Sequence, residues 1–345
     1  MTSAAPTARP AIWLVSARAD VLAILVAGPV ISLLLLAAAA HGPSFLIGAL
    51  LFAVFLDLPH VLHTHVRLLA NPADYRRNRG QFWGSLAFIT TLCVGLAAAG
   101  QFLWLVALWV YWQPYHVCKQ HFGVATLYAR RSGYRRDTQH VLYLMLAGFT
   151  APLLHRMSQG GFRFGDYELF GEKLPFANML VPTPPVPATL ALFAYGLFAL
   201  AACHFIWREW RDTRTDGAGL PHFVWWMLLV SLALYNAAYL FVSDLYALIL
   251  IGTSIHAIQY HLVCVSTVKT AVSQARTPPD SSAIVRYLHA AVARISGTRW
   301  LAFALVGAGL VVLATEIPTL GIIPLIVVLH HFYLDGVIWK RRPGA

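Results

Sequence analysis

The sequence predicts an all-α membrane protein, a polytopic helical bundle with about ten transmembrane helices. The 345-residue chain has 59% hydrophobic and 11% charged residues and a mean hydropathy of +0.64, so too few charges remain to cover a water-soluble domain. Its apolar runs have close to the roughly 20 residues that a helix needs to cross the hydrocarbon core of a bilayer. These runs are 21–40, 44–66, 82–100, 102–128, 139–155, 186–207, 222–243, 245–268, 298–315 and 318–340.

The connections between these runs predict a single membrane domain over residues 1–345. The first run has no small-residue cleavage site, so we interpret it as a retained helix and not as a signal peptide. Short breaks at Gly42-Pro43 and Gly100-Gln101 predict antiparallel hairpins of neighbouring helices. The run 139–155 is short for a transmembrane helix.

Three segments lie outside the predicted membrane region. Residues 1–20 form a predicted cytoplasmic tail, and residues 156–185, which are rich in glycine and proline, form an exported loop that is either an ordered cap or a loose lid. Residues 269–299 form a cytoplasmic loop. Within it, Asp280-Ser281 is a plausible N-cap for an amphipathic helix that lies on the inner leaflet.

The basic residues set the predicted orientation. Lys and Arg follow the second, fourth, sixth, eighth and tenth runs, whereas only Arg156, Arg163 and Lys173 lie on the other side. Short cytoplasmic loops carry the excess of Lys and Arg, so both termini are predicted to be cytoplasmic. This asymmetry and contact with anionic lipids account for the net charge of +11, which is poor evidence for nucleic-acid binding.

Histidines inside the apolar runs are the strongest functional signal. Nine of the 15 histidines fall in four clusters. These clusters are His60, His63 and His65; His116 and His121; His256 and His261; and His330 and His331. All four clusters lie on predicted helices that run from the outer side of the membrane to the cytoplasm. Each cluster is at the midpoint of its helix or in the cytoplasmic half. Imidazoles at membrane depth are costly unless they face a partner or a metal, so the clusters predict one metal site open to the cytoplasm.

Helical spacing refines this prediction. The side chains of Asp57, His60 and His63 are three residues apart and point towards one side of their helix. Those of His331 and Asp335 also share a helix face. The pairs 116/121 and 256/261 are each five residues apart, which separates their side chains by about 140°. Both side chains of such a pair can bind one ion only if the helix contains a π-bulge. Otherwise they bind two separate ions, or one binds the ion and the other supports a ligand. We expect His60, His121, His256 and His331 to come together.

The types of residue in these clusters limit which metals and which substrates are expected. Many imidazoles, few carboxylates and no clustered thiolates favour iron, copper or zinc over calcium or magnesium. Asp57 and Asp335 are candidate ligands, bridges or acceptors for imidazole N–H groups. Tyr260 and Tyr333 adjoin histidines and are candidate proton donors. Apolar surroundings favour a lipophilic substrate.

These motifs resemble those of a known family. Leu58-Pro59-His60, His121-Phe122-Gly123, Ile255-His256 with His261, and His330 with Asp335 five residues later are similar, in order and kind, to the motifs of the bacterial Brp/Blh membrane family. Thr64 and Thr126 stand where acidic residues are expected. The resemblance implies oxidative cleavage of β-carotene to retinal by histidine-bound iron.

We therefore expect an iron-dependent oxygenase, with one or two ions, that uses O2 on an isoprenoid, carotenoid or acyl chain in the bacterial inner membrane. Membrane lipids and an electron-donor protein are the other expected partners. One alternative is a metal-ion or proton transporter, although such a path would scatter polar groups across the whole membrane thickness. The other is an intramembrane zinc hydrolase, although no H-E-x-x-H helix occurs.

Overall fold

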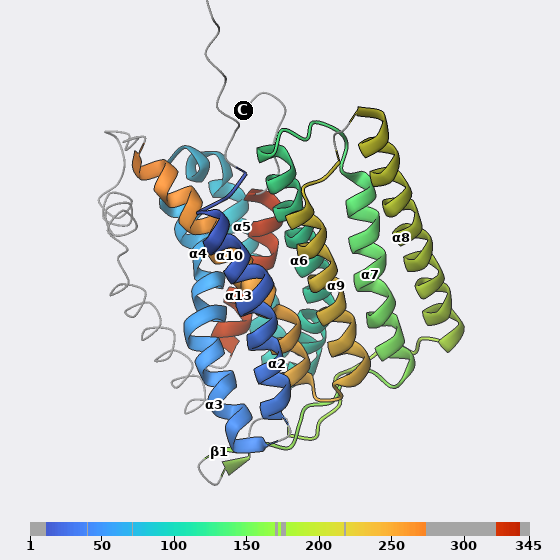
Figure 1. The fold of residues 1–345 in the computed structure, drawn as a ribbon. Helices are drawn as coiled ribbons and strands as arrows, with labels where there is room; N and C mark the ends of the chain where they lie inside the picture. The colour runs from blue at the N-terminus through green and yellow to red at the C-terminus, as the bar shows by residue number, and fades with distance from the viewer. Residues whose placement is uncertain are drawn as a thin grey trace, which may run out of the picture.

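The computed structural model describes residues 12–39, 41–70, 72–169, 172–173, 177–216, 219–273 and 322–338. These residues are almost entirely helical (Figure 1). The helices are α1 (Ala17–Val21), η1 (Leu22–Ala27), α2 (Gly28–Ala39), α3 (Gly42–Phe52), η2 (Ala53–Asp57), α4 (Leu58–Ala70), α5 (Pro72–Ala98), α6 (Phe102–Arg131), α7 (Gln139–Ser158), α8 (Ala188–Asp216), α9 (His222–Phe241), α10 (Leu245–Ser273) and α13 (Ile322–Ile338), where η denotes a π-helical segment. Two short strands, β1 (Glu168–Leu169) and β2 (Glu172–Lys173), pair antiparallel.

The helices run side by side as a bundle (Figure 1). Helices α7 and α8 lie at one edge, and α3 and α4 lie towards the other. Helix α6 packs against α10 and α13 in the interior, and α4 contacts both α10 and α13. Segments from the beginning, middle and end of the chain therefore meet in the centre of the bundle.

Among the described residues, six helices are long and apolar enough to cross a membrane, which is consistent with an integral membrane protein. They span Ala17–Ala39, Ser44–His65, Tyr75–Ala98, Ala188–Thr215, His222–Phe241 and Leu245–Ser266. All six overlap predicted runs, and the predicted break at Gly100 is confirmed, because α5 ends at Ala98 and α6 begins at Phe102. Helices α6, α7 and α13 cover three further runs without meeting the same length and composition criteria.

The count of ten spans and the cytoplasmic location of both termini stay predictions. The run 298–315 lies outside the described residues, as does the proposed surface helix that begins after Asp280-Ser281. Residues 1–11 of the predicted tail are also outside them.

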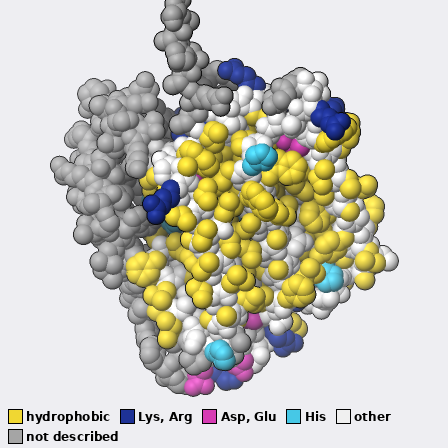
Figure 2. Space-filling model, in the orientation of Figure 1, with side chains coloured by type: hydrophobic (Ala, Val, Ile, Leu, Met, Phe, Trp, Pro, Cys, Tyr) yellow, Lys and Arg dark blue, Asp and Glu magenta, His cyan; other side chains and the backbone are white. Residues whose placement is uncertain are grey.

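The outer surface of the bundle has the distribution of side chains that a lipid environment favours. Figure 2 shows hydrophobic side chains over the middle of one face, with most charged side chains towards its two ends. Large apolar side chains such as Leu192, Leu200 and Phe88 are more than 60% exposed. Contiguous apolar surface of this kind is rare on soluble monomers and is the normal contact surface for lipid tails.

Close packing between α2 and α10 holds these two helices in register. A Cβ atom on Gly28 would lie 2.8 Å from Cγ1 of Ile255, so only glycine permits this approach. Ser32 donates a hydrogen bond to the carbonyl oxygen of Ile251 across the same interface. These contacts position the turn of α10 that carries His256.

The loop after α7 is fastened to the start of α10 over its described residues, while its location outside the cytoplasm stays a prediction. The carboxylate of Asp244 accepts hydrogen bonds from the Gly165 N–H and the Tyr167 hydroxyl, both at 2.7 Å. The same carboxylate accepts from the N–H groups of Tyr246 and Ala247 at the start of α10. One side chain thus caps a helix and fastens the loop to it.

Replacing Asp244 with alanine should therefore destabilise the protein. We expect the Asp244→Ala change to lower the free energy of unfolding by about 1–3 kcal/mol, because it removes a helix cap and leaves buried donors without an acceptor. Thermal unfolding in detergent measures this loss. The control is Asp166→Ala, which removes an exposed ion pair with Lys173 and should have little effect. Equal loss in both variants would contradict the role given to Asp244.

Candidate metal centre

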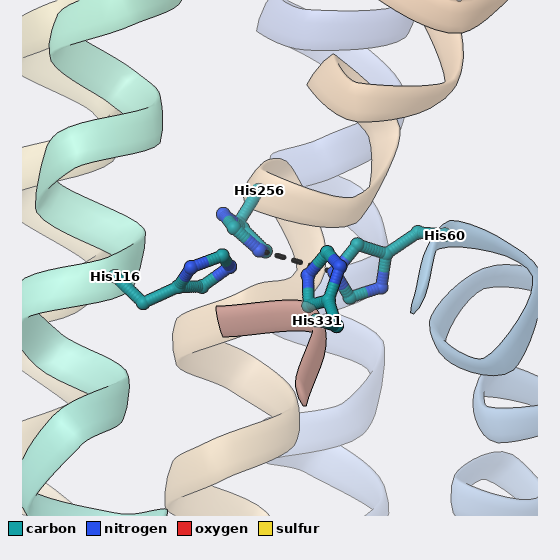
Figure 3. A group of neighbouring side chains, drawn as sticks. All are labelled: His60, His116, His256 and His331. Atoms are coloured by element: carbon teal, nitrogen blue, oxygen red, sulfur yellow. Dashed lines mark hydrogen bonds between the residues drawn. The ribbon is translucent and has the colours of Figure 1, made fainter. Parts of the chain in front are cut away.

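Four histidines from four helices meet inside the bundle and form a candidate metal centre. They are His60 on α4, His116 on α6, His256 on α10 and His331 on α13, and we call them the histidine tetrad (Figure 3). One nitrogen from each side chain lies within 4.8 Å of the other three. All four side chains are at least 95% buried.

Each of the four rings lies next to two of the others. The ring centroids of His60 and His256, and of His116 and His256, are 4.9 Å apart, and those of His331 lie 4.8 Å from His60 and from His116. The planes of these neighbours are inclined by 67° to 89°. Each ring therefore packs closely against two others, and each contributes one nitrogen to the group.

The nitrogens that face this centre fit a metal ion. Nε2 of His60 lies 3.2 Å from Nε2 of His256. Nε2 of His116 and Nε2 of His331 are buried without a hydrogen-bond partner among the described residues. Unsatisfied buried nitrogens are costly, and an ion supplies the missing interaction. Imidazole nitrogens that share an ion through bonds of about 2.1 Å lie about 3–4 Å apart, so the tetrad would contract to hold one.

Local hydrogen bonds fix the orientation of two tetrad members. Nδ1 of His60 donates to the carbonyl oxygen of Asp57, one turn earlier, at 2.8 Å. Nδ1 of His331 donates to the hydroxyl of Thr64 at 2.8 Å. Because the proton is on Nδ1 in each ring, the lone pair on Nε2 is available to a metal.

Thr64 connects the tetrad to Asp335. Its hydroxyl accepts from His331 and donates to Oδ1 of Asp335 at 2.8 Å, while the hydroxyl of Tyr260 also contacts Thr64 and donates to Oδ1 of Asp335 at 3.2 Å. Oδ2 of Asp335 lies 3.8 Å from Nε2 of His331 and 4.0 Å from Nε2 of His116. The carboxylate therefore places a negative charge beside the tetrad, where it would balance the charge of a bound cation.

The expected membership of the site is corrected at one position. We expected His121 with His60, His256 and His331, but the structure places His116 in the tetrad. The ring of His121 lies 6.2 Å from that of His256, and its Nδ1 faces the hydroxyl of Ser231 at 3.4 Å. The separation of about 140° between these two side chains on one helix explains why only one faces the centre.

The remaining predicted ligands form two pairs outside the tetrad. The rings of His63 and His261 are 5.6 Å apart, and Nε2 of His261 contacts the carbonyl oxygen of Leu56. Nε2 of His65 lies 3.0 Å from Nδ1 of His330. The five-residue spacing thus divides His256 from His261 in the same way that it divides the two histidines of α6.

Two other candidates occupy different surroundings. Asp57 remains 36% exposed, with Oδ1 3.4 Å from Nδ1 of His60 and therefore on the side of the ring opposite Nε2. Tyr260 contacts the tetrad, with ring centroids 5.6 Å from His60 and 5.8 Å from His331. Tyr333 instead lines a separate hollow together with Trp112 and Leu329.

A cavity of about 340 Å³ adjoins the tetrad between α6, α10 and α13. His116, Tyr260 and Asp335 form its wall on the tetrad side. The other lining residues are Trp112, Tyr115, Lys119, Gln120, Phe122, Gly123, Val124, Leu127, Val263, Phe332 and Gly336. Its volume lies within the usual range for small-molecule sites, and its lining is predominantly apolar.

Two residues of the site were given no role in the interpretation of the sequence. Thr64 was noted only as a departure from an acidic pattern, and Gln120, whose side-chain amide donates to the carbonyl oxygen of His256 at 2.7 Å, was not considered. The position of Thr64 four residues after His60 was the available signal. Comparison of the chain with family models, curated proteins and solved structures found no match.

The first prediction compares the two histidines of α6. His116→Ala should remove most bound metal from the purified protein, because one of four converging nitrogens is lost, whereas His121→Ala should retain it. Elemental analysis after dialysis measures the difference. Metal loss in His121→Ala together with retention in His116→Ala would contradict the assignment of the tetrad.

The second prediction concerns Thr64. Thr64→Val keeps the side-chain shape but removes the hydroxyl that orients His331, so metal affinity should fall by about 10–100-fold. Thr64→Ser should restore the affinity. Competition with a chelator gives the affinities, and Thr126→Val, in which the lost hydroxyl contacts Thr138, is the matched control on α6. Equal metal affinities for Thr64→Val and the wild type would contradict the role of Thr64 in orienting His331.

Proposed function

We propose that this protein is a membrane-embedded iron oxidoreductase that uses O2 to oxidise a lipophilic substrate. The observation that carries the proposal is the contact between a fully buried histidine tetrad and a predominantly apolar cavity. A cavity of this chemistry favours an isoprenoid, carotenoid or acyl chain. The apolar helix surfaces support an integral membrane location, and we propose the bacterial inner membrane.

The donor set supports iron as the bound metal. The tetrad offers four neutral imidazoles with one carboxylate nearby and no thiolate, which suits iron, copper or zinc. The resemblance to the Brp/Blh motifs favours iron among these three and makes carotenoids the first substrates to test. Convergence of four nitrogens on one point supports one ion at the tetrad.

The chain itself provides positioning, charge and a dry environment. When bound, iron would supply the ability to bind and reduce O2, a reaction that side chains alone do not perform. His60, His116, His256 and His331 would hold it through Nε2, and Asp335 would offset part of its charge. The cavity would place the substrate against His116 and exclude water from the reacting atoms.

Tyr260 is the residue best placed to handle a proton. It lines the cavity, contacts the tetrad and donates a hydrogen bond from its hydroxyl to Oδ1 of Asp335. A phenol that shares a hydrogen-bond network with a carboxylate can deliver a proton to the cavity and recover it from the network. Tyr333, which lines the other hollow, is not assigned this role.

The decisive test combines metal content with oxygen consumption. Protein purified from iron-replete cells should carry about one iron per chain and consume O2 as a carotenoid or another lipophile is lost. Asp335→Asn should still insert and fold, but its activity or metal affinity should fall by about 10–100-fold, because the shape is kept and the charge is lost.

Two outcomes would overturn this proposal. Zinc without iron, together with substrate hydrolysis, would favour the hydrolase alternative. Metal flux across proteoliposomes that depends on Asp335, with no O2 consumed against a broad lipid panel, would favour a transporter. His256→Ala, which removes a tetrad member, is the inactive reference for the oxygen assay.

A further inference from the structure

Lys119 is a partly buried cation on the long helix α6. It lies near the middle of α6 and lines the cavity, three residues after the tetrad member His116. An ammonium group at membrane depth is costly, so such a residue normally faces a partner or a functional site. Residues three apart on a helix share a face, which places Lys119 next to the metal centre along the cavity wall.

No carboxylate of the described residues pairs with this ammonium group. Among the described residues, Lys119 forms no ion pair or hydrogen bond, and its contact is the ring of Phe122, whose centroid lies 5.2 Å from Nζ. Asp335 lines the same cavity but lies beside the tetrad, next to His116 and His331. The two opposite charges therefore occupy different positions on one cavity wall.

The cavity extends along α6 on both sides of Lys119. Its lining on α6 extends from Trp112 to Leu127, a rise of about 22 Å along the helix axis. Tyr115 and Gly123, which flank Lys119 on the same helix face, are exposed, and Tyr115 is 55% exposed. A single-chain molecule thus has a route from the apolar surface to the cavity, past the ammonium group.

We propose that the cavity binds a single-chain lipophile with a carboxylate end group, and that Lys119 pairs with this carboxylate. The inference rests on the proposed function and specifies its substrate class. The apolar chain contacts Phe122, Val124 and Val263, while Lys119 supplies the charge that the carboxylate needs in an apolar setting. Asp335 repels the carboxylate from the tetrad, so an uncharged part of the molecule faces the metal centre.

Direct binding of radiolabelled oleic acid to the purified protein tests this proposal. The comparison ligand is oleyl alcohol, and the measurement is made at about pH 8, where free carboxylic acids are ionised. The wild type should bind the acid on the order of tenfold or more tightly than the alcohol, because an ion-paired hydrogen bond forms only with the acid. Lys119→Met should lose this preference, and Lys119→Arg should keep it.

Matched controls separate the charge from general effects. Lys173→Met removes a cation from the exposed β2 strand and should bind both ligands as the wild type does. Lys119→Met keeps the side-chain length and lowers the cost of insertion, so its oligomeric state and metal content should be unchanged. Its affinity for the alcohol should also be unchanged.

Several results would overturn the inference. They are equal binding of acid and alcohol by the wild type, an unchanged preference in Lys119→Met, or competition by phosphatidylglycerol as strong as that by oleic acid. Binding needs neither metal nor O2, so these results leave the proposed oxidation intact. If the protein binds the acid selectively but holds no iron and consumes no O2, the proposed oxidase function is wrong and the proposed carboxylate site is retained.

Discussion

A ring nitrogen buried within a helical bundle must interact with a partner, and in this protein four such nitrogens face one another. Outside the cavity that His116 lines, protein surrounds the tetrad, because all four histidines are at least 95% buried, so that partner must be a side chain or a bound ion. The surrounding structure follows from this constraint. The Asp57 carbonyl and the Thr64 hydroxyl hold two rings with Nε2 inward, and Asp335 brings a negative charge to the same point.

Much of the architecture could be predicted from hydrophobic segments and their interruptions. Gly100 adopts a φ of 69° between α5 and α6, as expected for a turn between two apolar runs. The run 44–66 is continuous in the structure, but it contains a π-helical turn, η2, which ends just before the motif around His60. Hydropathy alone gives no signal for such a turn, since it depends on how the backbone accommodates neighbours and the following proline.

The helices that form the site could be predicted better than the individual side chains that meet in it. Four histidine clusters at one depth identified α4, α6, α10 and α13 as its walls, and three of the four expected residues are in the tetrad. The choice between His116 and His121 depends on the rotation of α6, which is set by its packing against α10 and α13 and not by its own sequence. Thr64 was overlooked as a ligand support because a small hydroxyl residue in an apolar helix is usually explained by interhelical packing.

The tetrad also imposes an order on the biogenesis of the protein. Its members come from positions 60, 116, 256 and 331, and the last of them follows the third by 75 residues. During synthesis, three imidazoles enter the membrane while the fourth is still within the ribosome or the insertion machinery. The complete ligand set therefore exists only after α13 has joined the bundle, so metal loading reports that the chain has been inserted at least as far as α13. A chain terminated before His331 retains at most three of these ligands, whatever the quality of its earlier helices.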